Sequence, residues 1–371
     1  MRTGVLIACA LGAALASGPD VYRWDLPRGF PTPEVPAANP MSAVKVRLGR
    51  FLFYDKRLSV NGTQSCATCH KQELAFTDGR AFGLGATGQS HSRSAMSLVN
   101  VAYSAVLTWS NPNLRSLEEQ ALTPMFGEHP VELGMHGRES ELLARLRQTP
   151  VYGELFPLAF PAVRDPFTIA NITKALAAFE RSIISARSPY DRYHTGGEPA
   201  AVSDAVKRGE AVFFTDYEGS CFRCHGGFNF SGATRYRGRG PLPVEFHNTG
   251  LYNIAGPYSY PQPNLGIFEY TRRAEDVGRF KAPSLRNIAL TAPYMHDGSI
   301  ATLEDVVEHY AAGGRTIESG PYAGRGSANP HRDSRMAAIV MTEQNKRDLL
   351  AFLRSLTDEA LTHDERFADP W

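Results

Sequence analysis

The 371-residue sequence has little of several features that would place it in a familiar class. Its net charge is only +1, from 39 basic and 38 acidic residues, so it lacks the basic excess of a nucleic-acid-binding protein. Alternating strand patterns are few, and no apolar stretch beyond the first residues is long enough to cross a bilayer. We therefore expect a soluble, mainly α protein with long loops, which binds no nucleic acid and does not insert stably into a membrane.

The first residues are typical of an export signal. Arg2 precedes an apolar run that continues to Ala16, and residues 14–16 resemble a small-x-small cleavage site. We expect residues 1–17 to be a signal peptide that is removed, which places the mature protein in the periplasm. A retained anchor is the alternative. Lipidation at Cys9 is disfavoured because this residue lies inside the apolar run.

Cysteine is scarce, with five residues, and the four after Cys9 form two C-x-x-C-H motifs at residues 66–70 and 221–225. Exported proteins normally use cysteines in disulfides, but C-x-x-C followed directly by His is the haem c attachment pattern. The two thiols bond to one haem, and the histidine binds its iron. Two zinc half-sites or redox dithiols are the alternative. The expected residues are Cys66, Cys69 and His70 for haem 1 and Cys221, Cys224 and His225 for haem 2.

The same order of elements surrounds each motif. In the first half a helix begins near residues 39–40, and an amphipathic helix over 169–184 closes the unit. In the second half a helix over 205–214 precedes the motif, and a helix over 343–356 closes the unit. Residues 188–200 contain prolines and glycines and indicate a linker. The sequence thus predicts two c-type cytochrome domains in tandem, residues 18–195 with haem 1 and residues 196–371 with haem 2.

Further motifs resemble the bacterial dihaem cytochrome c peroxidases and, within them, the MauG-like group. The resemblance runs from about residue 39 to residue 356. Besides the haem motifs it rests on LFYD (52–55), AFTDG (75–79), LEEQA (117–121), PVELG (130–134), FKAPSLRN (280–287) and PYMHDG (293–298). Residues 96–103 and 124–130 are most similar to the MbnH-type branch, which is associated with tryptophan oxidation in a copper-binding partner, MbnP.

The resemblance implies that peroxide reacts at haem 1. Glu132 matches the family's acid/base carboxylate, Gln120 the glutamine that hydrogen-bonds the bound oxygen species, and Pro124 a pocket proline. A solvated loop residue is the alternative for Glu132, and His129 is a second candidate for handling the proton. His91 lies in the loop that supplies a resting ligand of haem 1 in ordinary peroxidases. We expect haem 1 to be open instead, as in MauG.

Two aromatic residues match positions near haem 2. Trp109 matches the tryptophan between the haems, where it would relay electrons or simply fill the domain interface. Thr302 and Asp305 predict the start of a helix whose apolar spacing turns Tyr310 inward and His309 away from the core. The resemblance implies that Tyr310 binds the haem 2 iron where peroxidases have Met. A core tyrosine is the alternative that periodicity leaves open.

The family also holds a calcium ion between the haems. Thr291 and Pro293 match its backbone ligands, and Ser94 stands where the family has Asn. MauG passes electrons through a surface Trp whose position is occupied here by Gly219. Tyr217 is the nearest oxidisable side chain and would take over this role, or it is a surface tyrosine with no role. We expect a partner to dock against the second domain, close to the haem 2 motif.

The function that the resemblance implies is that of a MauG/MbnH-like dihaem oxidoreductase. It would use hydrogen peroxide to oxidise the dihaem pair, and then a tryptophan on a periplasmic, MbnP-like protein by long-range electron transfer. The alternatives are a peroxide-scavenging dihaem cytochrome c peroxidase and a plain dihaem electron carrier. Tyr310 disfavours the former, and Gln120 with Glu132 disfavours the latter.

Overall fold

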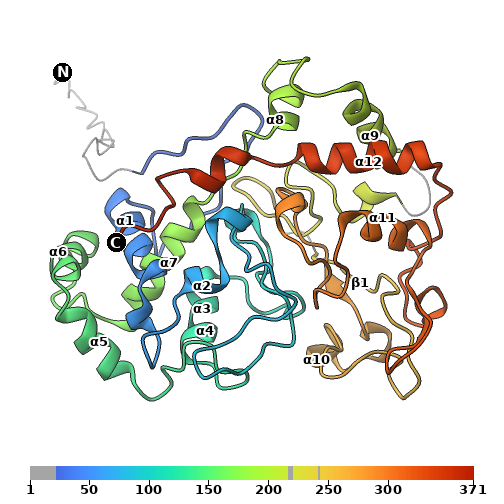
Figure 1. Ribbon diagram of the computed structural model, residues 1–371. Coiled ribbons are helices and arrows are strands. Elements are labelled where there is room, and N and C mark those ends of the chain that lie inside the picture. Colours follow the sequence, from blue (N-terminus) through green and yellow to red (C-terminus); the bar gives the residue numbers. More distant parts are fainter. Residues whose placement is uncertain (1–21, 216–219, 241–242) are drawn as a thin grey trace, which may run out of the picture.

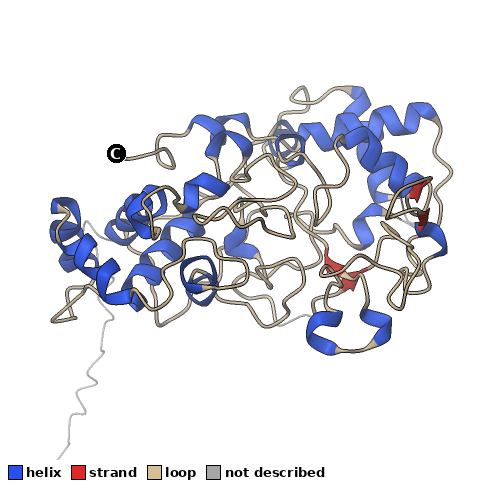
Figure 2. Ribbon diagram, turned by 60° about the horizontal axis from the view of Figure 1, so that its bottom comes forward, coloured by secondary structure: helices blue, strands red, loops and turns tan. Residues whose placement is uncertain are grey.

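The computed structural model describes residues 22–215, 220–240 and 243–371 (Figure 1). The expected signal peptide, Cys9, Tyr217 and Gly219 lie outside these residues. In the described part, strands are confined to two short antiparallel pairs, so most of the chain is helix and loop (Figure 2). The pairs are β1 (Phe246–His247) with β2 (Phe280–Lys281) and β3 (Thr316–Ile317) with β4 (Gly324–Arg325). This confirms the mainly α prediction.

Six helices of the first half pack around one hydrophobic core, which we call the first core. They are α1 (Ala43–Tyr54), α2 (Cys66–Cys69), α4 (Leu122–Phe126), α5 (Glu139–Arg147), α6 (Pro150–Ala159) and α7 (Ile169–Ser182). The short helix α3 (Leu117–Gln120) packs on α7 in a small separate cluster. The side chains of Ser42 and Thr168 accept hydrogen bonds from the first turns of α1 and α7, which explains where both helices begin. The two predicted helices are thus present, α1 beginning a few residues later and α7 ending two residues earlier than expected.

A glycine sets the crossing of α1 and α7. A Cβ atom on Gly49 would lie 1.9 Å from the carbonyl oxygen of Ala175 and 2.8 Å from the Cβ of Phe179. Only a residue without a side chain therefore lets the two backbones approach this closely. Figure 1 shows α1 beside α7 in this half of the molecule.

The second half repeats this arrangement with different residues. Its helices are α8 (Pro189–His194), α9 (Asp204–Phe214), α10 (Phe268–Thr271), α11 (Leu303–Ala311) and α12 (Glu343–Ser355). A Cβ on Gly209 in α9 would lie 1.9 Å from the carbonyl oxygen of Asp348 and 2.8 Å from the Cβ of Phe352 in α12. Ser203 and Thr342 cap α9 and α12, close to the predicted starts.

The predicted linker over 188–200 was wrong in its first half, which is the helix α8. Ser188 and Asp191 form a capping box, and Pro189 occupies the first turn, where its missing N–H costs nothing. The helix is held by the buried ion pair between Asp191 and Arg286, at 2.9 Å. Prolines and glycines here mark the ends of a short helix rather than a free segment.

Side chains from α8, α9, α11 and α12 form the second core. The chain end returns to the other half, because Leu361 and Phe367 pack in the first core. The division into domains at residue 195 stays a prediction. Among the described residues, no helix has the length and apolar character needed to cross a membrane.

Candidate functional site

The first C-x-x-C-H motif is presented by the short helix α2. The backbone N–H of Ser65 donates to Thr68 Oγ1 at 3.0 Å, which closes the first turn. His70 Nδ1 lies 2.9 Å from the carbonyl oxygen of Phe76, so Nδ1–H donates there and Nε2 is left for a metal. Burial lowers the pKa of His70, which keeps the imidazole neutral, the form that binds iron.

The loop that carries Glu132 is tied to a second loop. The N–H of Ala86 donates to the carbonyl oxygen of Glu132 at 2.6 Å, and the N–H of Val131 donates to Gln89 Oε1 at 2.9 Å. A Cβ on Gly85 would lie 1.8 Å from the carbonyl oxygen of Val131, so the two backbones are in direct contact. Loop 85–91 therefore holds the position of Glu132.

His91, at the end of this loop, lies against the Glu132 carboxylate. Its Nε2 is 3.2 Å from Glu132 Oε1, at an angle outside that of a hydrogen bond. The charge of Glu132 also acts on His70, where it raises the pKa against the larger effect of burial. His129, the other candidate for proton handling, is exposed. His91 is thus the histidine that the fold brings to Glu132.

The other residues expected at haem 1 lie on α3 and α4. Gln120 ends α3, and Pro124 lies within α4. The carbonyl oxygen of Pro124 accepts from the N–H of Leu133 at 2.8 Å, which joins α4 to the Glu132 loop. The structure therefore brings Pro124 next to this loop, and the role of Gln120 stays a prediction.

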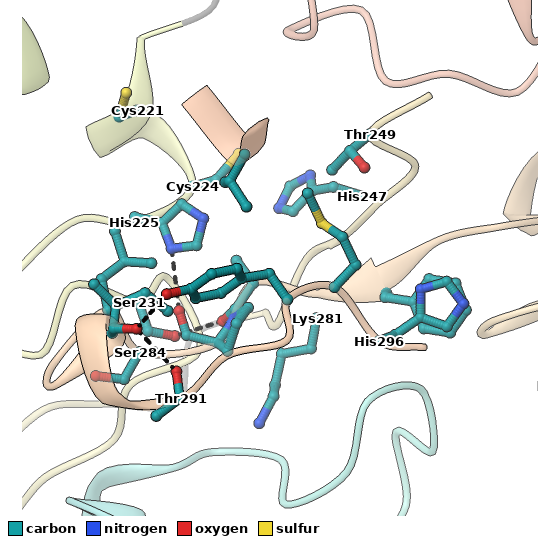
Figure 3. Close-up of a pocket in the computed structure, with 18 of the residues that line it drawn as sticks. Cys221, Cys224, His225, Ser231, His247, Thr249, Lys281, Ser284, Thr291 and His296 are labelled. Carbon is teal, nitrogen blue, oxygen red and sulfur yellow. Dashed lines mark hydrogen bonds between the residues drawn. The ribbon is translucent and has the colours of Figure 1, made fainter. Parts of the chain in front are cut away.

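The second motif lines a large cavity, whose wall is formed mostly by the second half and partly by first-half residues such as Ser94 and Trp109 (Figure 3). His225 Nδ1 lies 3.1 Å from the carbonyl oxygen of Pro283 and 3.3 Å from that of Phe230, so this imidazole is oriented as His70 is. Burial lowers the pKa of His225 to about 4. Cys221 and Cys224 line the same cavity as free thiols. Two free thiols and a neutral histidine around an apolar cavity fit the attachment of haem c.

Tyr310 lies on α11 and faces this cavity, as the sequence predicted. Thr302 caps the helix, with the N–H of Asp305 donating to its Oγ1 at 3.1 Å. Burial raises the pKa of the Tyr310 phenol, and the nearby thiols add to this. The phenol is therefore neutral unless a cation lies beside it.

The prediction that His309 turns away from the core was wrong, since its exposed fraction is only 4%. The side of α11 away from the cavity is covered by the following chain. The N–H of Gly314 donates to the carbonyl oxygen of His309, and the N–H of Ile339 donates to that of Ala311. The helix is buried on two sides, so its apolar spacing marked only one of them.

Trp109 lies where the two halves meet. Its indole N–H donates to the carbonyl oxygen of Ser94 at 2.9 Å, and the N–H of Ser94 donates to that of His296 at 2.8 Å. Trp109 lines the same cavity as Tyr310, which fits both the relay and the packing interpretation, and its role stays a prediction.

The three expected calcium ligands also lie together. Ser94, Thr291 and Pro293 all line the cavity, although the carbonyl of Ser94 already accepts from the indole. Among the described residues, no group of three or more His, Cys, Asp or Glu side chains could hold a metal ion. A calcium site would have to be built from carbonyl and hydroxyl oxygens, and it stays a prediction.

Sequence reasoning missed several residues of the cavity. Met336 and Met341 line it, and either offers a thioether near haem 2. His247 also lines it, and its Nδ1 lies 2.7 Å from Asp333, which raises the pKa of His247 to about 9 although burial lowers it. Buried Lys281 donates to the carbonyl oxygen of Val106 at 2.7 Å. Met336 and Met341 come from a loop, and His247 and Lys281 from two-residue strands that are too short to show a periodic pattern.

Comparisons with known proteins agree with this geometry. Residues 43–199 match the family described as di-haem cytochrome c peroxidase. The chain is 34% identical to "Cytochrome-c peroxidase IdrP1" of Denitromonas iodatirespirans, covering 98% of this chain and 95% of the relative. It is 33% identical to "Methylamine utilization protein MauG" of Methylorubrum extorquens, covering 91% and 84%.

A solved structure agrees over nearly the whole chain. It is the "MauG-like protein associated with microbial copper homeostasis", 47% identical, with a TM-score of 0.92 over 95% of this chain and 100% of that one. The chain therefore belongs to the dihaem cytochrome c peroxidase family that includes MauG, and it is a peroxidase-type oxidoreductase.

Proposed function

We propose that this protein uses hydrogen peroxide to oxidise a tryptophan on a periplasmic partner protein of the MbnP type. When bound, two covalent haem c groups would supply the redox chemistry by accepting the two oxidising equivalents of peroxide. The observation that carries the proposal is the position of Tyr310. It faces the cavity that Cys221, Cys224 and His225 also line.

A phenol at this position favours storage of oxidising equivalents. Burial keeps Tyr310 neutral in the protein alone, because its pKa is raised. A ferric ion beside it would reverse this direction, since a bound cation stabilises an anionic ligand. The phenolate would then stabilise higher oxidation states of the iron, whereas a methionine ligand raises its potential. The 47% identity with a MauG-like protein of copper homeostasis supports the same conclusion.

The residues around Glu132 support the first step at haem 1. Cleaving the O–O bond of peroxide requires a proton to move from the near oxygen to the far oxygen, and a carboxylate can carry it. Glu132 is held by its backbone through Ala86, and its side chain contacts His91. Two anchored loops would thus keep the carboxylate in place as the proton moves.

Trp109 would connect the two haems in this scheme. Its indole is anchored to Ser94 and lines the haem 2 cavity. An oxidisable ring halfway replaces one long electron transfer by two short ones. A calcium ion bound by Ser94, Thr291 and Pro293 would hold the same junction together.

A second function is favoured by a specific observation. Met336 and Met341 line the haem 2 cavity, and a thioether is the ligand that the peroxidases of this family use. In that case the protein would scavenge peroxide, with electrons from small cytochromes. The 34% identity with a cytochrome-c peroxidase over 98% of the chain fits this alternative.

Whole-protein mass spectrometry of the protein encoded next to this one tests the proposal. Incubation with the haem-loaded protein and peroxide should add oxygen to, or remove hydrogen from, one tryptophan, and omission of either should prevent this. Tyr310→Phe should change the haem 2 spectrum and stop the modification, whereas Met336→Leu and Met341→Leu should leave both unchanged. If a methionine variant changes the spectrum and Tyr310→Phe does not, the peroxidase alternative is correct.

A further inference from the structure

We propose that Tyr260, Tyr252 and Tyr322 carry oxidising equivalents from the haem 2 cavity to the surface, where Tyr322 meets the protein substrate. We call these residues the tyrosine relay. The inference rests on the proposed function, because it needs the oxidant that peroxide generates at the haems. It adds a path and an exit point, neither of which the family motifs contain.

The three rings form a continuous chain of contacts. Tyr260 is buried and lines the cavity together with Trp109 and Tyr310. Its ring centroid lies 5.3 Å from that of buried Tyr252, with the planes at 85°. Tyr252 lies in turn 5.5 Å from Tyr322, with the planes at 64°. Tyr322 is 46% exposed, so the chain begins at the cavity wall and ends in solvent.

Contact between the rings is what makes the path effective. Electron tunnelling falls off exponentially with the distance between donor and acceptor, so several short steps through oxidisable groups are faster than one long step. Edge-to-face contacts such as these place neighbouring ring edges at van der Waals distance. An exposed end station lets a protein substrate be oxidised without entering the cavity.

A buried carboxylate lies where it can accept the proton that Tyr252 would lose on oxidation. The Tyr252 hydroxyl donates to Asp297 Oδ2 at 2.6 Å, and Asp297 is itself buried. Burial, with the charge of Asp297, raises the pKa of Tyr252, so the phenol carries its proton at rest. A phenol that loses an electron becomes strongly acidic, so the proton would pass to the carboxylate that already accepts its hydrogen bond.

Each transfer moves one electron inward along the tyrosine relay. One electron leaves Tyr252 and passes inward through the ring of Tyr260, while the O–H bond of Tyr252 breaks and an O–H bond forms on Asp297 Oδ2. Tyr322 then donates an electron to Tyr252, which recovers its proton from Asp297, and the phenolic proton of Tyr322 leaves to solvent. A substrate tryptophan finally supplies an electron to Tyr322, which regains a proton from water. Two such transfers supply the two electrons that one molecule of hydrogen peroxide accepts.

Hydrogen bonds and a close backbone contact hold the segments that carry Tyr252 and Tyr322 together. Tyr252 lies in the loop after β1, and Tyr322 lies between β3 and β4. The amide of Asn329 donates to the carbonyl oxygen of Tyr252 at 2.9 Å, and the amide of Asn253 donates to that of Arg325 at 3.1 Å. A Cβ on Gly324 would lie 1.9 Å from the carbonyl oxygen of Asn253. The strand pair that carries Tyr322 is thus fixed directly to the loop that carries Tyr252.

The test uses the haem-loaded protein, hydrogen peroxide and a nitroso spin trap, without a partner. Peptide mass spectrometry should find the trap adduct on Tyr322, and rapid-freeze electron paramagnetic resonance should show a tyrosyl signal. Tyr252→Phe should lower the Tyr322 adduct at least tenfold, although Tyr322 is still present. Tyr270→Phe is the matched control, because Tyr270 is 43% exposed but lies on α10, and it should change nothing.

Equal labelling of Tyr322 in the wild-type protein and in Tyr252→Phe would overturn the relay, as would labelling of Tyr270 equal to that of Tyr322. Tyr322→Phe, a surface change that leaves the core intact, covers the case in which Tyr252→Phe does not fold. It should slow oxidation of the partner at least tenfold. Unchanged partner oxidation in Tyr322→Phe would overturn the relay while the proposed function stands. A labelled Tyr322 with an unmodified partner would support the relay and contradict the proposed substrate.

Discussion

The two haem motifs are built on the same scaffold but open onto different surroundings. Both histidines donate Nδ1–H to backbone carbonyls, and both lie beside a helix pair that crosses at a glycine, Gly49 in α1 and Gly209 in α9. Beyond the scaffold, the first motif faces anchored loops with Glu132 and His91, and the second faces an apolar cavity. The scaffold therefore fixes the orientation of the histidine, and the loops around it determine which chemistry each haem would perform.

The contrast extends to the closing helices. Glu180 follows Phe179 in α7 as Leu353 follows Phe352 in α12, and Phe179 and Phe352 make the equivalent contacts with Gly49 and Gly209. Leu353 lines the haem 2 cavity, whereas Glu180, when it is ionised, raises the pKa of Cys66 in the first motif. One half thus places a carboxyl group at the position where the other half places a hydrocarbon.

The largest effect should come from removing the carboxylate of Glu132 at the first site. Glu132→Gln should lower the rate of the peroxide reaction at haem 1 about 100-fold or more, because the proton carrier is lost. The haem 2 spectrum should not change, since Glu132 lies on the other side of the molecule's junction. Stopped-flow absorbance with peroxide measures both. A rate within a factor of three of the wild type would remove the acid/base role.

A substitution of His91 tests the same difference between the first and the second site. His91→Gln should lower the peroxide rate about tenfold and change its pH profile, because the imidazole in contact with the Glu132 carboxylate is lost. The resting spectrum of haem 1 should stay the same. His136→Gln is the control, since His136 lies 3.7 Å from Glu128 in a similar but exposed pair. A faster reaction with a changed resting spectrum would instead show that His91 is a resting ligand of haem 1.

The shared scaffold can be broken in either half by adding one methyl group. Gly49→Ala and Gly209→Ala should each lower the free energy of unfolding by about 1–3 kcal/mol or more, because the new Cβ would overlap a carbonyl oxygen. Gly153→Ala in α6 is the control, with no atom within 4 Å of its Cβ, and it should raise stability by about 0.5–1 kcal/mol. Chemical denaturation followed by far-UV circular dichroism measures all three. Equal costs would confirm that the halves are equivalent scaffolds.

A pH-dependent effect concerns the buried carboxyl of Glu180. Burial raises its pKa to about 8, although Arg181 opposes this, and its Oε2 has no hydrogen-bond partner. The folded state therefore favours the protonated form, and this contribution to stability is lost as the pH rises from about 4.5 to about 8. Glu180→Gln should be the more stable protein at pH 8, by roughly 1–4 kcal/mol, and the difference should shrink toward pH 4.5.

Glu118 supplies a control of opposite sign. Burial raises its pKa, but the hydrogen bonds from Arg181 and Asn39 outweigh this and bring the pKa to about 2. Its contribution is therefore present above about pH 4.5 and is lost as the pH falls toward 2. The free energy of unfolding of each variant, relative to the wild type, should therefore change with pH in opposite ways. Glu118→Gln should lose its disadvantage as the pH falls toward 2, and Glu180→Gln should gain its advantage as the pH rises toward 8. Parallel curves would show that Glu180 is ionised in the folded protein.

Much of the helical framework could be predicted from the sequence. Thr302 with Asp305 correctly marked the start of α11, and apolar periodicity placed α7, α9 and α12 to within two residues. The same signals failed where packing on a second side decided the outcome. His309 is buried by the chain that follows α11, and α8 forms because Asp191 finds Arg286 almost a hundred residues away. Periodicity reports one buried face, not how many faces are buried.

The sequence by itself determined the family and the paired helices around each motif, and it predicts the haem attachment points. These follow from contiguous residues whose chemistry or spacing is read directly, such as Cys66, Cys69 and His70. Only the tertiary structure decided that His91 meets Glu132 and that Tyr260, Tyr252 and Tyr322 touch in series. These residues come from irregular loops, whose paths are set by long-range hydrogen bonds and close backbone contacts rather than by local preference. No periodic pattern in the sequence indicates such long-range contacts.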